Sequence, residues 1–152
     1  MEFKKLLLES AILLMSCDGE IAEVEVAELN EIADNTTYFA GMDLKQEMNN
    51  LLPQFRKTTE EDIQKFYKTL RAKDLSIVQE LLLLEINLRI TYSDKILHES
   101  EVEFIKTLRG VCNAPDEILI ERFGKLEFLM RDTSINEIKE QNMKPRINEN
   151  ES

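Results

Sequence analysis

The chain is poor in residues that interrupt helices, since its 152 residues include three prolines and four glycines. It also lacks the alternating runs of valine, isoleucine and threonine that are typical of half-buried strands, whereas apolar residues recur at helical spacing. Together these features predict an all-α protein. The length suits one compact domain, because a chain of this size buries about two-thirds of its unfolded surface in a single core.

Positive charge is scarce. The chain has 19 lysines and arginines against 30 acidic residues, and its formal net charge is −11. Nucleic acids are bound by clustered cations that neutralise phosphates, and no such cluster is present, so nucleic acid is excluded as a partner. The one basic run, from Arg56 to Lys73, is interleaved with acids. We interpret it as a solvated helix face, with a partner-docking patch as the alternative.

Long hydrophobic runs are also missing. The apolar stretch Leu81–Leu84 is closed off by Glu85, far short of the roughly 20 residues that a membrane-spanning helix needs. Glu9 interrupts the apolar N-terminal run and no small-residue cleavage site follows, so we expect no signal peptide. We therefore expect a cytoplasmic protein without direct membrane insertion. Cys17 and Cys112 lack metal-type spacing, and a disulfide is not expected in that compartment.

An acidic motif occurs twice in the chain. Asp-Gly-x-Ile-x-x-x-Glu at residues 18–25 returns as Asp-Lys-x-Leu-x-x-x-Glu at residues 94–101, at an offset of 94 − 18 = 76. The same offset relates further positions on both sides of the motif: Leu8/Leu84, Glu9/Glu85, Leu29/Ile105 and Ile32/Leu108. The pattern predicts a single bundle of about seven helices that contains a duplicated helix-loop-helix unit.

An apolar helix that runs into Asp-Gly-x-apolar-x-x-x-Glu, followed by a second amphipathic helix, resembles the TerB-like tellurite-resistance family. The resemblance covers roughly residues 5–130, and the first copy fits it well, whereas the second has Lys95 in place of the glycine. The resemblance implies a compact, all-helical, non-catalytic bacterial domain of metal and envelope stress systems. It also implies protein partners, among them membrane-bound or chaperone proteins.

The repeated motif supplies four candidate metal ligands: Asp18, Glu25, Asp94 and Glu101. Their spacing matches the second half of a calcium-binding helix-loop-helix loop, in which the final glutamate is bidentate. The first half does not match, because its first ligand position falls on Leu14 in one copy and on Ile90 in the other. Two interpretations stay open. Either the acids satisfy backbone N–H groups and helix dipoles, or acids from one or both copies converge on a hydrated divalent cation.

Glu9 and Glu85 form a second acidic candidate, because they interrupt apolar helices at equivalent positions of the two copies. If the copies pack about a pseudo-twofold axis, these carboxylates meet or contact cations from neighbouring helices. A half-buried pair of that kind has a raised pKa or binds a cation. The alternative places each glutamate at the polar edge of its helix. His98 is the sole histidine, which excludes a site built from several imidazoles, and we expect it to serve a helix start.

Expected helices cover residues 2–17, from 22 to about 33, 43–51, from 60, 75–92, 99–112 and from 115. The third of these should stop before Pro53, and Asp74 should cap the fifth. The last should present a core face of Ile118, Leu119, Phe123, Leu126 and Met130. We expect one domain over residues 1–132 and a polar, partly disordered tail over residues 133–152.

No phosphate-binding loop, nucleophile elbow or dinucleotide fingerprint is present, so neither catalysis nor a cofactor is expected. The sequence therefore favours a non-catalytic helical protein-interaction module of a bacterial stress or tellurite-resistance system. The alternative is a divalent-metal binding or sensing domain that uses the loop and helix-start carboxylates. Nothing in the sequence indicates the oligomeric state.

Overall fold

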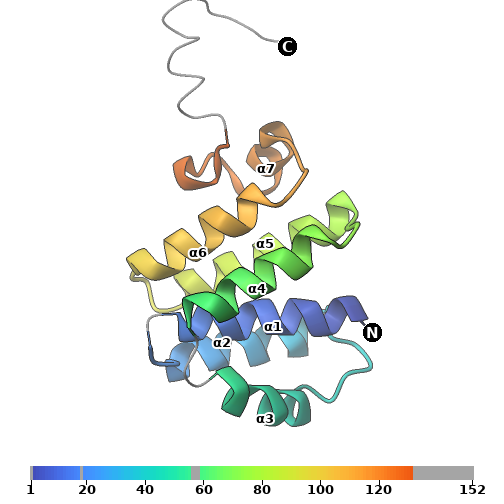
Figure 1. Ribbon diagram of the computed structural model, residues 1–152, viewed down its shortest axis with the longest axis vertical. Helices are drawn as coiled ribbons and strands as arrows, with labels where there is room; N and C mark the ends of the chain where they lie inside the picture. The colour runs from blue at the N-terminus through green and yellow to red at the C-terminus, as the bar shows by residue number, and fades with distance from the viewer. Residues whose placement is uncertain (1, 18, 56–58, 132–152) are drawn as a thin grey trace, which may run out of the picture. The chain divides into compact units, whose positions relative to one another are not determined.

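The computed structural model describes residues 2–17, 19–55 and 59–131, and these residues contain seven α-helices, one 3₁₀ turn and no strand (Figure 1). The prediction of an all-α fold with about seven helices is confirmed. The helices are α1 (Glu2–Ser16), α2 (Glu23–Asn35), α3 (Leu44–Phe55), α4 (Glu60–Arg71), α5 (Ile77–Tyr92), α6 (Glu99–Gly110) and α7 (Asp116–Phe123). The predicted tail, residues 133–152, lies outside the described residues.

The chain divides into two compact units, Met1–Ala114 and Pro115–Ser152. The first unit contains α1 to α6, and the second contains α7 and the 3₁₀ turn Glu127–Leu129. The boundary between them precedes α7, whereas the sequence suggested one domain that extends to residue 132.

The first unit is built around α1 and α5. α1 packs against α5, α3 and α6, while α5 also packs against α2 and α6. From Leu6 to Ser16 every residue of α1 except Glu9 is buried, and α5 is buried along most of its length. Each fully buried leucine or isoleucine side chain contributes about 1.5–3 kcal/mol of transfer free energy, so this pair of helices contributes a large part of the core. α1 and α5 are therefore the two central helices of this unit.

Two helix boundaries were predicted wrongly. α3 continues through Pro53 to Phe55. Proline removes one backbone N–H and therefore one i→i−4 hydrogen bond, and so close to the end of a helix the remaining turn tolerates that loss. α5 begins at Ile77 instead of Leu75, because Ser76 rather than Asp74 is its N-cap and forms a reciprocal capping box with Gln79. α4 has a hydroxyl cap, as Thr59 and Asp62 form the same kind of box.

The buried face of the segment after residue 115 is also smaller than predicted. α7 ends at Phe123, where Gly124 takes a left-handed conformation with φ 81°. A helix cannot continue through that conformation, so residues after it leave the 3.6-residue periodicity on which the prediction relied. Of the five residues expected on that face only Leu119 is buried, and Leu129 in the 3₁₀ turn is the other buried residue among residues 115–131.

One buried carboxylate secures the end of the first unit. Glu80, on the first turn of α5, is 3% exposed. Its two oxygens accept hydrogen bonds from the backbone N–H groups of Asn113, at 2.9 and 3.0 Å, and of Ala114, at 2.9 Å. These N–H groups follow the last turn of α6 and have no acceptor within the helix, so the carboxylate serves as their acceptor. Glu80 therefore ties the start of α5 to the segment that leaves α6.

Candidate functional site

The two acidic turns adopt matching local geometry. α2 begins at residue 23 and α6 at residue 99, which agrees with the offset of 76. Their N-cap residues, Ala22 and His98, have nearly the same backbone angles: φ −80°, ψ 142° and φ −80°, ψ 134°. The N–H of Gly19 donates to the carbonyl of Ser16 at 3.0 Å, and the N–H of Lys95 donates to that of Tyr92 at 3.1 Å. These agreements are local, so superposition of the complete helix pairs stays a prediction.

Asp94 organises the second turn. Its Oδ1 accepts the backbone N–H of Ile96 at 3.0 Å, and its Oδ2 lies 3.0 Å from Nε2 of His98. Burial alone would raise the pKa of Asp94, but the hydrogen bond from Ile96 and the interaction with His98 outweigh it, and the pKa lies below its ordinary value. The carboxylate therefore stays ionised while it orders the turn. Asp18, its counterpart in the first turn, lies outside the described residues.

Glu25 and Glu101 occupy the same position in the first turns of α2 and α6 and are 1% and 0% exposed. Their deep burial was missed by sequence reasoning, which assigned them either a role at the helix start or a place among metal ligands. A signal was present, because Glu25, Leu29 and Ile32 follow the i, i+4, i+7 spacing of one helix face. Neither Ala22 nor His98 forms a side-chain cap, so these glutamates do not belong to capping boxes.

The predicted metal ligands do not form one cluster among the described residues. Among the described residues no group of three or more His, Cys, Asp or Glu side chains is arranged to hold a metal ion. Glu25, Asp94 and Glu101 therefore do not form such a group with one another. Asp18, the fourth predicted ligand, lies outside the described residues.

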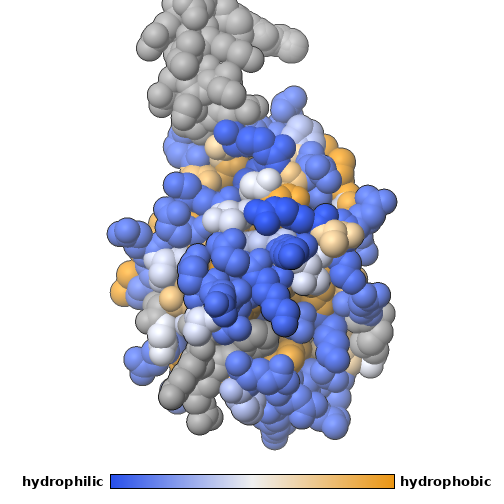
Figure 2. All heavy atoms as spheres, in the orientation of Figure 1, coloured by the Kyte–Doolittle hydropathy of each residue, from blue (hydrophilic) through white to orange (hydrophobic). Residues whose placement is uncertain are grey.

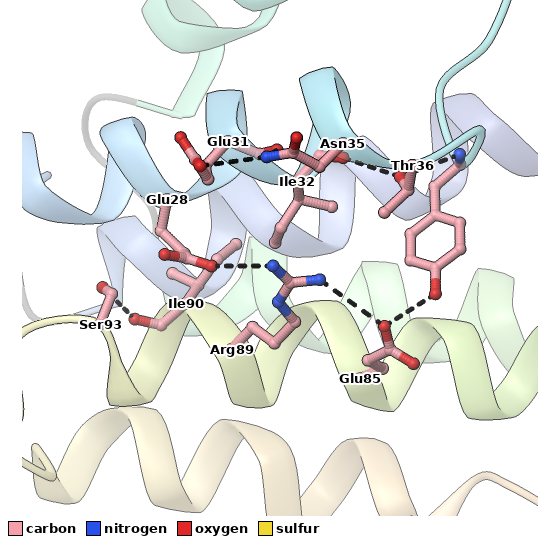
Figure 3. Close-up of polar contacts among 10 residues, drawn as sticks. Glu28, Glu31, Ile32, Asn35, Thr36, Glu85, Arg89, Ile90 and Ser93 are labelled. Carbon is pink, nitrogen blue, oxygen red and sulfur yellow. Dashed lines mark hydrogen bonds and ion pairs between the residues drawn. The ribbon is translucent and has the colours of Figure 1, made fainter.

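Glu85 lies in a network that joins three parts of the first unit (Figure 3). Its Oε2 accepts the phenol of Tyr38 at 2.8 Å and lies 3.9 Å from the guanidinium of Arg89, one turn along α5. Nη2 of the same guanidinium lies 3.3 Å from Oε2 of Glu28 on α2. Arg89 thus bridges α5 to α2, while Tyr38 attaches the segment after α2 to α5. All these groups are partly exposed, so the network fixes geometry more than it adds stability.

Glu9 has different neighbours. Its carboxyl is half-buried, and burial raises its pKa, while the charges of Lys5 and Lys73 act in the opposite direction. The sequence tied a raised pKa to a half-buried pair of carboxylates, whereas the raised pKa of Glu9 comes from loss of hydration. Glu9 and Glu85, equivalent in the repeat, are therefore surrounded by different charged groups.

The turn between α5 and α6 also exposes large apolar side chains. Tyr92, Ile96 and Leu97 are 40%, 60% and 49% exposed. Figure 2 shows a mostly hydrophilic face, with orange atoms at its left edge, where Figure 1 places this turn. A second pair, Ile77 and Val78, is exposed at the opposite end of α5. Sequence reasoning treated Leu97 only as the apolar position of the motif, since periodicity does not report exposure in a turn.

Comparison with known families adds the identity of the fold. The family model described as "Tellurite resistance protein TerB" matches residues 7–120 of the 152. The chain belongs to the TerB family. The match begins inside α1, includes both acidic turns and ends within α7, so the TerB region takes in residues on both sides of the division at Ala114. No curated protein and no solved structure matches the chain. No helix among the described residues of this TerB family member is long and apolar enough to cross a membrane.

Proposed function

We propose that this TerB family member is a non-catalytic interaction module of a bacterial tellurite-resistance or stress system, and that it contacts a protein partner through the α5–α6 turn. The observation that carries the proposal is the exposure of Tyr92, Ile96 and Leu97 within six consecutive residues. Exposed apolar side chains occur singly on most proteins, but three together on one turn form the kind of patch that marks contact sites.

The backbone of this turn supports the proposal, because it is held in place on both sides. α5 and α6 pack against each other, and Asp94 bonds the N–H of Ile96 and the ring of His98 within the turn. A fixed turn loses little conformational entropy on binding, so its apolar side chains contribute more of their burial energy to affinity. Such a surface acts by docking and needs no reactive group.

Affinity capture from the native host with paired variants tests the proposal. Ile96→Ser with Leu97→Ser removes the apolar tip of the turn, while Ile77→Ser with Val78→Ser removes a matched pair at the other end of α5. Both should keep the wild-type melting temperature within a few degrees, since exposed side chains contribute little to stability. We expect the first variant to lose specific captured proteins and the second to keep them. Equal capture by both variants would contradict the assignment of the turn.

A divalent-metal binding or sensing role is the second candidate, and one observation favours it. Glu25 is 1% exposed, and its Oε2 has no hydrogen-bond partner within the described part of the chain. A buried carboxylate oxygen in that position is costly unless something compensates its charge. A cation held together with Asp18 would do so, and the stability measurement at the end of the Discussion separates this candidate from the first.

A further inference from the structure

A groove of about 260 Å³ lies in the first unit between α4, α6 and the end of α1. Residues from the three elements line it: Cys17, Glu60, Ile63, Gln64, Tyr67, Ser100, Glu103, Phe104 and Thr107. It is separate from the exposed turn, although Ser100 lies only three residues after Leu97. The groove is therefore a distinct surface feature next to the proposed contact.

Contacts beneath the groove hold its two walls together. The phenol of Tyr67 on α4 donates to the backbone carbonyl of Phe104 on α6 at 2.8 Å. The rings of Phe66 and Phe104 stack with centroids 6.4 Å apart. Tyr67 and Phe104 are almost completely buried, so they form the base of the groove while smaller side chains form its surface. The walls are thus set by packing and do not have to be assembled by a ligand.

The groove is negatively charged on both walls. Glu60 stands on α4 and Glu103 on α6, and no lysine or arginine is among the described residues that line the groove, a description that omits residues 56–58. Glu60 accepts the side-chain amide of Gln64 at 3.1 Å. Glu103 lies 3.6 Å from Nζ of Lys106, but both side chains are largely exposed, at 66% and 49%, so that ion pair is weak. An anionic ligand would be repelled from both sides.

We infer that this groove receives the side chain of an arginine on a basic segment of the partner protein. A guanidinium is planar, always charged and carries five N–H donors directed to both sides, which suits two carboxylates on opposite walls. Gln64, Ser100 and Thr107 add neutral acceptor oxygens, and Ile63 offers an apolar surface for the methylene stem. The formal net charge of −11 also attracts a basic partner segment.

This inference rests on the proposed function, because it assumes a protein partner, yet its test needs no partner. The ¹⁵N-labelled full chain is titrated with N-acetylarginine amide, and backbone amide shifts are followed. We expect saturating shifts at Gln64, Ser100 and Thr107. N-acetylcitrulline amide, which has the same shape but no charge, should produce much smaller shifts at those positions. Equal shifts from citrulline, from N-acetyllysine amide or from magnesium ions would overturn the assignment of a guanidinium site.

Two double variants complete the test. Glu60→Gln with Glu103→Gln should weaken binding of the arginine amide by roughly two- to tenfold, since each exposed ion pair that is lost is worth only about 0.2–1 kcal/mol. Glu117→Gln with Glu121→Gln changes the net charge equally on α7 and should leave the dissociation constant unchanged. Equal weakening by both would mean that the overall negative field attracts the probe, which refutes the groove. Failure here leaves the α5–α6 turn proposal intact, and failure of affinity capture leaves the titration result intact.

Discussion

Lys95 adopts a left-handed backbone conformation, with φ 63°, at the position that Gly19 occupies with φ 93° in the other acidic turn. Lys95 is the only non-glycine residue with positive φ among the described residues. Glycine enters this region without steric cost, whereas a side chain with a Cβ pays roughly 1 kcal/mol or more to do so. Both positions therefore have positive φ, although only the first carries the residue that suits this conformation best.

Lys95→Gly should consequently raise the free energy of unfolding by up to about 1 kcal/mol, because it removes that backbone strain at the cost of some unfolded-state entropy. Urea unfolding of the two proteins measures the difference. Gly19→Ala is the converse change. No atom lies within 4 Å of a Cβ placed at Gly19, so its cost is conformational and should also be about 1 kcal/mol. Destabilisation by Lys95→Gly would show that the lysine side chain has a stabilising role.

Glu80→Ala should destabilise the protein by about 1–3 kcal/mol, because it leaves the buried N–H of Ala114 and the part-buried N–H of Asn113 without their acceptor. Urea unfolding again provides the measurement, with the exposed Glu121→Ala as a control that should stay within about 0.5 kcal/mol of wild type. A loss below 0.5 kcal/mol for Glu80→Ala would mean that water replaces the carboxylate without cost.

Glu9 should make stability depend on pH. Its unfolded-state pKa is near 4.5 and its folded-state pKa is higher because the carboxyl is partly buried. Between these values the folded protein binds more protons than the unfolded chain, so stability falls as pH rises through the window that starts near 4.5. Glu9→Gln should therefore stabilise the protein at neutral pH, and the gain should disappear as pH falls below that window. Destabilisation by Glu9→Gln at neutral pH would contradict the burial explanation.

Helix periodicity and capping chemistry made much of the fold predictable. The hydroxyl cap at Thr59, the glycine turn at Gly19 and the equivalent starts of the helices after residues 22 and 98 could all be recognised from local sequence. The errors arose where two local rules compete. Pro53 usually ends a helix, yet α3 continues through it, and Ser76 rather than Asp74 became the cap of α5.

The candidate site was less predictable, because its important properties depend on tertiary packing. The sequence identified Glu25 and Glu101, but only the packed structure shows that both are buried. Hydrogen bonds over long sequence separations, such as those from Tyr38 to Glu85 and from Asn113 to Glu80, leave no local signal. The same holds for the groove between α4 and α6, since its walls come from segments that periodicity treats separately.

We propose that the acids of the two turns serve the folding of the turns, and that the surface around them serves the function. Melting temperatures of the wild type with and without millimolar calcium, magnesium or zinc test this claim most directly. We expect no metal-dependent change, and Asp18→Ala should cost about 0.5–2 kcal/mol that added metal does not restore. A bound cation at about one hundred times its dissociation constant would instead add about 2.7 kcal/mol. A reproducible metal-dependent rise that disappears in both Asp18→Asn and Glu25→Gln would contradict the account and make metal sensing the function.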